Sequence, residues 1–148
     1  MVVSPDLGSV TRVRSFAQKL DVPIAIVDKR RQKANVSEVM NIIGDVKDKT
    51  VILADDMIDT AGTLCNAAKA LMGKGAKEVY ACATHAVLSG PAIERIKESP
   101  IKELVFLDTI PIPPEKMLDK FRILPVAPVF AEAIARIYSD KSVSTLFV

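Results

Sequence analysis

The sequence is poor in several residue types whose presence would point to a particular class of protein. Its 148 residues include no tryptophan, one histidine and two cysteines, Cys65 and Cys82. The cysteines have no metal-binding spacing, and they lie in a predicted helix and a predicted strand. We interpret them as small buried apolar residues in a reducing compartment. A metal site built on these two cysteines is therefore not expected.

Long apolar runs and a strong charge imbalance are also missing. No stretch of about 18 apolar residues occurs, so no transmembrane helix is expected, and the N-terminus lacks the pattern of a secretory signal peptide. The 20 basic and 18 acidic residues leave a net charge of +2, which gives no reason to expect nucleic acid or a membrane as a partner. We therefore expect a cytoplasmic protein.

The remaining composition is that of a globular protein. Hydrophobic residues make up 49% and charged residues 26% of the sequence, and 148 residues are enough for one domain with a substantial core. We therefore predict a single domain over residues 1–148. The chain begins with a short apolar segment directly before a turn, and from this start we expect a domain taken from a longer protein.

Segments with the patterns of strands and of helices alternate along the chain. Strands are predicted at 23–27, within 36–46, and at 51–54, 77–84, 103–107 and 121–126, and helices at 11–20, 64–72, 92–98 and 127–138. The alternating tail at 141–147 predicts an edge strand or a strand that pairs with another chain. This order of elements predicts an α/β fold, a three-layer sandwich with a mainly parallel central sheet.

The most informative stretch is residues 51–63. Four apolar residues, Val51 to Ala54, are followed by the adjacent acids Asp55 and Asp56 and then by Asp59. An apolar run of this kind indicates a buried strand of a parallel sheet, and an amphipathic helix pattern follows it. The acids therefore lie where a strand leads into a helix, which is the place where open α/β sheets bind ligands.

The loop after these acids combines small residues with hydroxyl groups. Residues 59–63, Asp-Thr-Ala-Gly-Thr, offer backbone N–H groups at a helix start, and such groups form a cradle for an anion such as phosphate. Asp55 and Asp56 repel an anion and suit the hydroxyl groups of a sugar or a hydrated divalent cation. A phosphate site beside a diol site describes a sugar phosphate. The alternative is a solvated acidic loop in which Thr60 caps the helix.

Two further segments follow predicted strands. The loop at 6–9 opens the helix at 11–20 and offers a second helix N-terminus, although a plain turn explains its lone glycine equally well. The run from Lys29 to Lys33 carries four cations in five positions. Cations at this place would neutralise charge that develops on a transferred phosphoryl group. The alternative for this run is a solvated basic loop.

Residues 51–63 resemble the phosphoribosyl pyrophosphate binding motif of type I phosphoribosyltransferase folds, in the form found in the ribose-phosphate pyrophosphokinase family. The resemblance runs from Val2 to Phe147 and covers the C-terminal half of that family's proteins. It implies a type I phosphoribosyltransferase-like fold in which Asp55 and Asp56 hold the ribose hydroxyls. The residues implied to bind the 5-phosphate are Asp59, Thr60, Ala61, Gly62 and Thr63.

The first loop carries the same resemblance. Ser4 to Val10 is similar to the family's pyrophosphate loop, which implies roles for four residues. These are Asp6, Leu7, Gly8 and Ser9. Asp6 matches the acid that helps to hold Mg²⁺ in the family, and Ser9 stands where a second glycine is usual.

The basic run and the tail extend the resemblance further. The basic run is similar to the family's catalytic flexible loop, which implies that Lys29 and Arg31 are the catalytic cations. Ser142 and Ser144 match a tail that contributes to a regulatory phosphate or nucleotide site between subunits. Together with the motif at 51–63, these two segments make the resemblance specific.

The activity that the resemblance implies is transfer of the diphosphoryl group of ATP to the 1-hydroxyl of ribose 5-phosphate, which makes phosphoribosyl pyrophosphate. In the family the N-terminal half carries the adenine contacts and a metal-binding histidine, and these are not in the present sequence. We therefore expect the chain to bind ribose 5-phosphate, to bind ATP poorly, and to be weakly active or inactive alone. The parent protein is expected to be a homo-oligomer.

Two other activities use related sequences. A phosphoribosyltransferase would use the same motif to consume the activated sugar, but it needs a hood of aromatic residues for the base, and aromatic residues make up 5% of this chain. A non-catalytic regulatory homologue of the synthetase usually has a disrupted loop or motif, and both segments look intact here.

Overall fold

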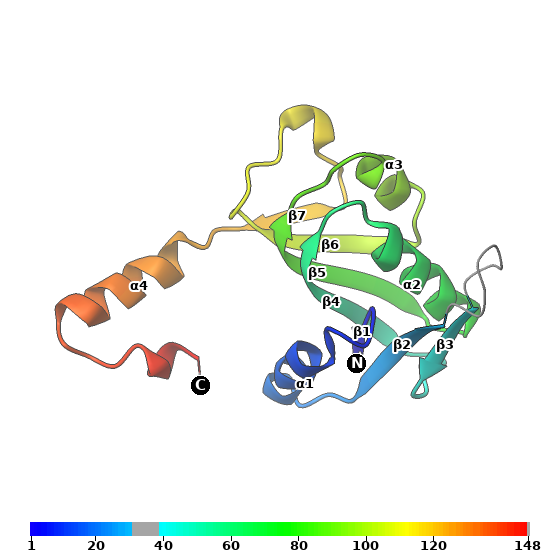
Figure 1. Cartoon of the computed structure of the whole chain (residues 1–148), viewed down its shortest axis with the longest axis horizontal. Coiled ribbons are helices and arrows are strands. Elements are labelled where there is room, and N and C mark those ends of the chain that lie inside the picture. Colours follow the sequence, from blue (N-terminus) through cyan, green and yellow to red (C-terminus); the bar gives the residue numbers. More distant parts are fainter. Residues whose placement is uncertain (31–38, 148) are drawn as a thin grey trace.

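A seven-stranded sheet forms the centre of the protein (Figure 1). In the computed structural model, which describes residues 1–30 and 39–147, the strand order is β3-β2-β1-β4-β5-β6-β7. The strands are β1 (Val2–Ser4), β2 (Ile24–Arg30), β3 (Val39–Ile43), β4 (Thr50–Ile58), β5 (Glu78–Ala86), β6 (Ile101–Leu107) and β7 (Phe121–Leu124). Strand β3 pairs antiparallel with β2, and the other neighbouring strands pair parallel. The predicted mainly parallel sheet is therefore confirmed.

Helices pack on both faces of this sheet. The helices are α1 (Val10–Lys19), α2 (Gly62–Gly73), α3 (Ala92–Lys97) and α4 (Ala127–Tyr138), with short 3-10 helices η1 (Pro114–Lys116) and η2 (Ser144–Leu146). Successive residues of a strand point to opposite faces, so Val2 packs with Val13 of α1, while Val3 belongs to the core that includes Leu71 of α2. The helix α3 lies on the same side as α2 (Figure 1). This arrangement confirms the three-layer α/β class.

The strand β4 is longer than predicted, and this changes where the acids lie. The prediction ended the strand at Ala54, but it continues to Ile58 and carries Asp55 and Asp56 within it. The reason is the neighbouring strand β5, with which Asp55 pairs opposite Ala83 and Ile58 opposite Ala86. Backbone pairing with β5 thus keeps the acidic residues extended, although carboxylates are not typical of strands.

The strand β2 also runs further than predicted and enters the basic segment. It was expected to end at Val27 but reaches Arg30, because β3 pairs with its last residues. Lys29 lies opposite Met40 in this pairing. Arg31, the second of the two cations predicted to be catalytic, lies outside the described residues.

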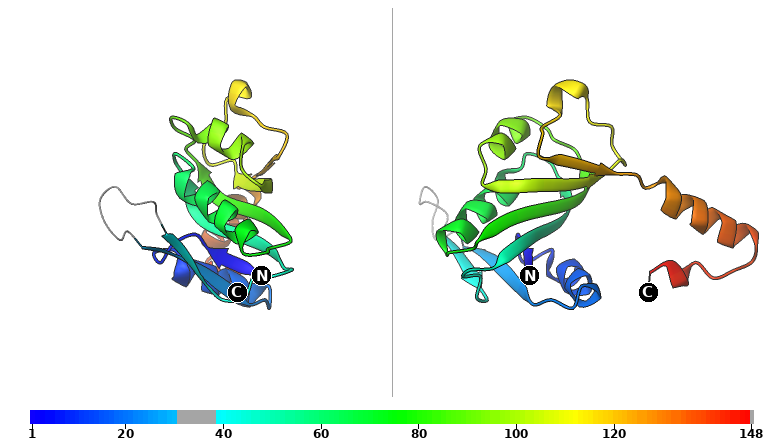
Figure 2. Two further views of the ribbon diagram at one scale, coloured as in Figure 1. Left: turned by 90° about the vertical axis from the view of Figure 1, so that its right-hand side faces the viewer. Right: turned by 180° about the vertical axis from the view of Figure 1, so that it is seen from behind.

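The C-terminal part departs most from the prediction. The helix α4 has the predicted bounds, but it extends away from the sheet rather than packing on it (Figures 1 and 2). The predicted strand at 141–147 is wrong, because residues 144–146 form η2. Ser142 bends the chain there, since its hydroxyl accepts a hydrogen bond from the Ser144 N–H at 3.3 Å, a local bond that competes with strand pairing.

The described helices are too short or too polar to cross a membrane. Over residues 1–30 and 39–147, none combines the length and the apolar character that a bilayer span requires.

Candidate functional site

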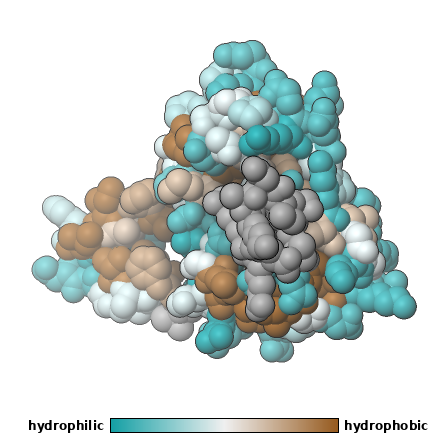
Figure 3. All heavy atoms as spheres, turned by 45° about the vertical axis from the view of Figure 1, so that its right-hand side comes forward, coloured by the Kyte–Doolittle hydropathy of each residue, from teal (hydrophilic) through white to brown (hydrophobic). Residues whose placement is uncertain are grey.

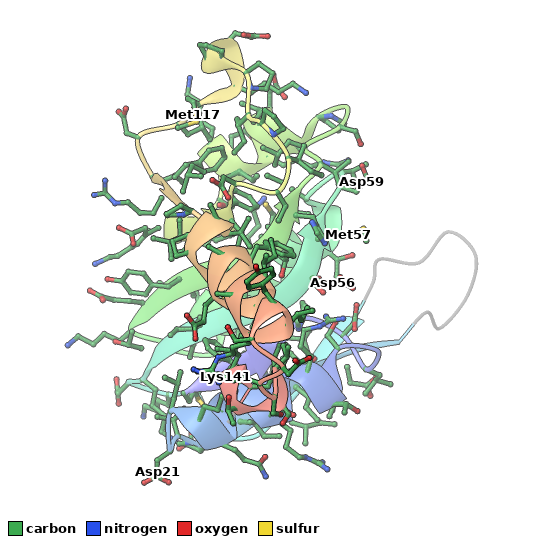
Figure 4. The ribbon with its side chains drawn as sticks, turned by 90° about the vertical axis from the view of Figure 1, so that its left-hand side faces the viewer. Asp21, Asp56, Met57, Asp59, Met117 and Lys141 are labelled. Carbon is green, nitrogen blue, oxygen red and sulfur yellow. The ribbon has the colours of Figure 1, made fainter. Side chains whose placement is uncertain are left out.

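A pocket of about 170 Å³ lies where β4 leads into α2. It is lined by residues of the first loop, the end of β4 and the start of α2. The lining residues are Asp6, Asp55, Met57, Ile58, Asp59, Thr60, Ala61, Gly62, Thr63 and Leu64. Asp56, Met57 and Asp59 follow one another along one edge of the molecule (Figure 4). The structure therefore brings the predicted first loop and the predicted 59–63 loop into one cavity, at the carboxyl end of β4.

The 59–63 loop enters α2 through an unusual backbone conformation. Ala61 is the N-cap and has a φ of 59°, in the left-handed region that residues with a side chain rarely adopt. No side chain of the described residues caps this helix, so the alternative in which Thr60 acts as a cap is wrong. The first N–H groups of a helix have no partners within it. The loop thus leaves a helix N-terminus without a side-chain cap at the wall of the pocket, as an anion site requires.

Two residues distant in sequence hold this loop in place. The Ser89 hydroxyl donates a hydrogen bond to the Asp59 carboxylate, and the Ser89 N–H donates to the Asp59 carbonyl at 3.1 Å. Arg95 donates from Nη1 to the Thr60 carbonyl at 3.0 Å. A Cβ added at Gly62 would lie 3.3 Å from that same nitrogen, so glycine leaves room for the arginine. The loop is therefore fixed by the segment after β5 and by α3.

Asp55 is more enclosed than its neighbour Asp56, with 18% of its side chain exposed against 46%. Its Oδ1 accepts hydrogen bonds from the Ser9 hydroxyl at 3.0 Å and from the Asp56 N–H at 3.0 Å. Burial raises the pKa of Asp55 above its ordinary value, and the nearby charges of Asp56 and Asp6 raise this pKa further, while the two hydrogen bonds oppose the shift. Asp55 is thus a carboxylate held in one orientation at the pocket wall.

Asp56 has a different environment from its neighbour. Its Oδ2 accepts from Arg12 Nη2 at 2.9 Å, and its Oδ1 accepts from the Met57 N–H at 2.8 Å. Partial burial raises the pKa of Asp56, but the Arg12 guanidinium and the Met57 hydrogen bond outweigh it and bring the pKa below its ordinary value. Arg12 Nη1 also lies 3.4 Å from Asp55 Oδ1. One arginine therefore bridges the two adjacent acids, and Asp56 is not among the pocket-lining residues.

Hydrogen bonds to Asp6 stabilise the first loop. Asp6 Oδ1 accepts the Ser9 N–H at 2.9 Å, and the Ser4 hydroxyl donates to the Asp6 carbonyl at 2.6 Å. Leu7 is exposed, and a Cβ at Gly8 would lie 3.3 Å from Asp6 Oδ1. Ser9 is buried and points toward Asp55. A serine at this position therefore links the first loop to β4, which a glycine cannot do.

The acids of the pocket suit a magnesium ion that is shared with a substrate. Within residues 1–30 and 39–147, no three histidine, cysteine or acidic side chains gather into a cage that could hold a metal alone. Mg²⁺ commonly uses one or two carboxylates together with water and substrate phosphates. Asp6 and Asp55 both line the pocket, and Asp6 is close enough to raise the pKa of Asp55. These two side chains therefore fit such an ion.

Two other groups of predicted site residues are not placed at the pocket. The backbone of Lys29 lies on β2, but the structure does not describe its side chain, and Arg31 falls outside the described residues. Ser142 and Ser144 lie in the C-terminal tail, where their hydroxyl oxygens are 2.6 Å apart. Their predicted roles stay predictions.

Three contacts of the site were not predicted from the sequence. They are made by Arg12, Ser89 and Arg95, which come from α1, from the segment after β5 and from α3. A signal existed for Arg12, because a basic residue in the first turn of a helix opposes the helix dipole and so calls for an acidic partner. No comparable signal marks Ser89 or Arg95.

Comparisons with known proteins show what this chain is similar to. The family model described as "Phosphoribosyl synthetase-associated domain" matches residues 31–148. The ribose-phosphate pyrophosphokinases of Caldanaerobacter subterraneus subsp. tengcongensis and Clostridium tetani are each 69% identical over 147 residues, which is 99% of this chain and 46% of the relative. The chain thus spans about half the length of the curated relatives it matches.

Solved structures show the same likeness. The phosphoribosylpyrophosphate synthetase from Mycobacterium smegmatis has a TM-score of 0.85 and 40% sequence identity, covering 94% of this chain and 45% of that one. The orotate phosphoribosyltransferase from Aeropyrum pernix has a TM-score of 0.58 and 14% identity, covering 90% of this chain and 64% of that one. The second likeness concerns the fold alone and confirms the type I phosphoribosyltransferase architecture.

Proposed function

The chain belongs to the phosphoribosyl synthetase family, and from this premise we propose that it is a ribose-phosphate diphosphokinase domain. The proposed reaction transfers the β,γ-diphosphoryl group of ATP to the 1-hydroxyl of ribose 5-phosphate. The hydroxyl oxygen bonds to the β-phosphorus, the bond from that phosphorus to the α-phosphate oxygen breaks, and AMP leaves. The products are AMP and phosphoribosyl pyrophosphate.

The main support for this proposal is that a single pocket contains both a helix N-terminus, which suits an anion, and a carboxylate, which suits a hydroxyl group. At one end, residues 59–63 lead into α2 without a side-chain cap, and this end suits a dianionic phosphate. At the other end, Asp55 is a fixed hydrogen-bond acceptor, which suits a sugar hydroxyl. An anion alone would be repelled by the acid, and a sugar alone would leave the helix terminus unused. A sugar phosphate satisfies both.

The residues around the pocket then take separate roles. Asp55 and Asp56 accept hydrogen bonds from the ribose 2- and 3-hydroxyls, and residues 59–63 hold the 5-phosphate. Asp6 and Asp55 would hold Mg²⁺, which would supply positive charge to neutralise the phosphates. Lys29 and Arg31 stabilise the charge that develops on the transferred group. The chain therefore acts mainly by positioning and neutralising its substrates.

The proposal includes weak or absent turnover by this chain alone. Its curated relatives are about twice as long, and the resemblance implies that the adenine contacts lie in the half that this sequence does not match. We propose that ribose 5-phosphate binds here, that ATP binds poorly, and that the longer parent forms homo-oligomers. Release of AMP at the rate of a full-length relative would contradict this part of the proposal.

Titration calorimetry with ribose 5-phosphate tests the binding site directly. Asp55→Asn keeps the size of the side chain but removes its charge, and we expect affinity to fall by about tenfold or more, since a hydrogen bond to a charged group contributes roughly 1.5–3 kcal/mol. Asp45→Asn is the matched control, because Asp45 is an exposed acid outside the pocket. Equal binding by wild type and Asp55→Asn would refute the proposed diol site.

A further inference from the structure

The first turn of α2 has backbone N–H groups without acceptors. The N–H groups of residues 61–64 donate to no residue in the part of the chain that the structure describes. In an α-helix each N–H donates to the carbonyl four residues earlier, so the acceptors expected for residues 62–64 are the carbonyls of Ile58, Asp59 and Thr60. All three carbonyls accept hydrogen bonds from another part of the chain instead.

The donors belong to the segment 88–95, which leads from β5 into α3. The three pairs are the Leu88 N–H with the Ile58 carbonyl at 3.0 Å, the Ser89 N–H with the Asp59 carbonyl at 3.1 Å, and Arg95 Nη1 with the Thr60 carbonyl at 3.0 Å. Two of these donors are backbone groups, and the third is a side chain. Because Arg95 does not line the pocket, it acts on a ligand there only through the loop.

The bond from Arg95 also fixes the direction of the peptide group between Thr60 and Ala61. The carbonyl of this trans peptide points to Arg95, so its N–H points the opposite way. Ala61 follows with a φ of 59°, which is unfavourable for a residue with a Cβ. A right-handed Ala61 would relieve this strain and bring the Thr60 carbonyl to the Leu64 N–H. Arg95 therefore keeps that acceptor away from α2.

We propose that Leu88, Ser89 and Arg95 form a carbonyl clamp that keeps the first turn of α2 open for a phosphate group, and that Arg95 is its positioning residue. The clamp holds the carbonyls of residues 58–60, so the N–H groups of residues 61–64 remain available to phosphate oxygens. Arg95 acts through Thr60 and does not touch the phosphate. The inference rests on the proposed function, since it concerns the 5-phosphate subsite at residues 59–63.

The segment that carries the clamp is itself held in place. Leu88 is buried with a φ of 51°, and Gly90 has the same φ, so two left-handed residues turn the chain on either side of Ser89. Lys116 of η1 donates from Nζ to the Leu88 carbonyl at 2.9 Å. A left-handed residue with a side chain persists where its surroundings hold it. The clamp is thus formed before a ligand binds.

Arg95 can be replaced without disturbing the core. The buried residues of α3 are Ala92 and Ile96, whereas Arg95 is exposed. The outer surface over α3 and η1 is mostly hydrophilic (Figure 3). Lys69 lines a recess of about 200 Å³ together with Arg95, but it makes no hydrogen bond or ion pair with the described residues. Lys69→Ala is therefore a matched control that removes a nearby positive charge and leaves the Thr60 carbonyl bound.

NMR titration of the full chain with inorganic phosphate tests the clamp without the sugar. We expect phosphate to shift the amide signals of residues 61–64 in wild type. In Arg95→Ala the Leu64 N–H turns to the Thr60 carbonyl, so one hydrogen bond to the anion is lost and phosphate affinity should fall by about tenfold. Arg95→Lys keeps a donor and should recover part of this loss, and Lys69→Ala should bind as wild type does. Unshifted amides in wild type, or equal losses in Arg95→Ala and Lys69→Ala, overturn the proposal.

The backbone of Ala61 gives a readout that general destabilisation does not change. The three-bond coupling between its amide and α protons reports φ, and it is measured without a ligand. We expect Arg95→Ala to move Ala61 to the right-handed region, and Lys69→Ala to keep the φ of wild type. An unchanged φ in Arg95→Ala would show that Arg95 does not hold the peptide, and would overturn the proposal.

Calorimetry with ribose 5-phosphate separates the clamp from the proposed function. We expect Arg95→Ala to bind this ligand about tenfold more weakly than wild type, for the same lost hydrogen bond. If wild type binds inorganic phosphate at residues 61–64 but not ribose 5-phosphate, the proposed function fails and the clamp stands. If wild type and Arg95→Ala bind ribose 5-phosphate equally well, the clamp is refuted and the proposed function stands.

Discussion

Adjacent acids with opposite pKa shifts define the site at the scale of single residues. Burial raises the pKa of Asp55, whereas Arg12 and a backbone hydrogen bond bring the pKa of Asp56 below its ordinary value. The enclosed acid is the one that lines the pocket, and the paired acid stands beside it. A charge that is costly to bury is retained where a ligand uses it, which is typical of functional sites.

The raised pKa of Asp55 has a consequence for stability. Ionisation of this carboxyl is less favourable in the folded chain than in the unfolded chain. At pH values above the folded pKa, the ionised carboxylate therefore lowers the free energy of unfolding. This loss of stability disappears below the ordinary pKa of 3.8, where the group is protonated in both states. We expect Asp55→Asn to be more stable than wild type at pH 7 and to lose that advantage as pH falls toward 4. Urea denaturation at several pH values measures the difference.

The control for this prediction is Asp45, whose pKa is shifted in the opposite direction from that of Asp55. The pKa of Asp45 is lowered, first by the Lys47 N–H and then by Lys49, so its ionised form stabilises the fold and this contribution is lost as pH falls through the folded pKa. Asp45→Asn should therefore be no more stable than wild type at pH 7. A gain in stability for both variants would show that removal of any acid, rather than relief of a buried one, is responsible.

Arg12 gives a second prediction at the residue scale. It contacts both acids, so Arg12→Ala leaves their repulsion uncompensated and should raise the pKa of Asp56. We expect ribose 5-phosphate to bind several-fold more weakly, with Arg12→Lys intermediate because lysine keeps the charge but lacks the forked donors that contact one acid each. The pKa is measured by NMR titration of the carboxyl. Arg14→Ala, an exposed cation of the same helix, should change neither quantity.

At the scale of elements, the start of α2 depends on a single backbone conformation. Ala61 is buried with a φ of 59°, a conformation that disfavours branched side chains. Ala61→Val should therefore lower the free energy of unfolding by about 1–3 kcal/mol and weaken ribose 5-phosphate binding. Ala131→Val, in exposed α4, tests helix propensity alone and should cost less than about 1 kcal/mol. Equal losses measured by urea denaturation would contradict a role for the left-handed turn.

The elements that could be predicted are those whose patterns are local. The apolar run at 51–54 and the amphipathic pattern at 127–138 each predicted an element correctly, and the 59–63 loop was placed at the pocket. The errors arose in segments whose structure depends on pairing with a segment distant in the sequence. The extension of β4 to Ile58 depends on β5, and the tail at 141–147 found no strand partner in the described chain. Sequence patterns carry little information about such distant contacts.

The same reasoning explains which site contacts were missed. Residues 55 to 63 are contiguous, so their shared role was visible in the sequence. Ser89 and Arg95 reach the 59–63 loop from segments about 30 residues away, and only the folded sheet brings them near. Asp56 was predicted to share one role with Asp55, yet Arg12 gives it a different electrostatic environment.

At the scale of the whole molecule, ligand binding should stabilise the folded chain. A ligand that binds the folded state alone, at about 100 times its dissociation constant, adds about 2.7 kcal/mol. For a chain of this size that corresponds to a rise in Tm of roughly 5–10 °C. Differential scanning fluorimetry with ribose 5-phosphate should show this rise, and ribose without the phosphate should show little. An equal effect of both sugars would exclude residues 59–63 as the phosphate site.

The place of the pocket in the sheet has a consequence for how the chain responds to its ligand. The strands β1 and β4 are parallel neighbours, and the order in which strands are added to the sheet reverses between them, because β2 follows on one side of this junction and β5 on the other. A ligand at this junction touches loops from both halves of the sheet. We therefore expect the ligand to bridge the two halves of the sheet, so that its removal weakens the fold first along the junction between β1 and β4.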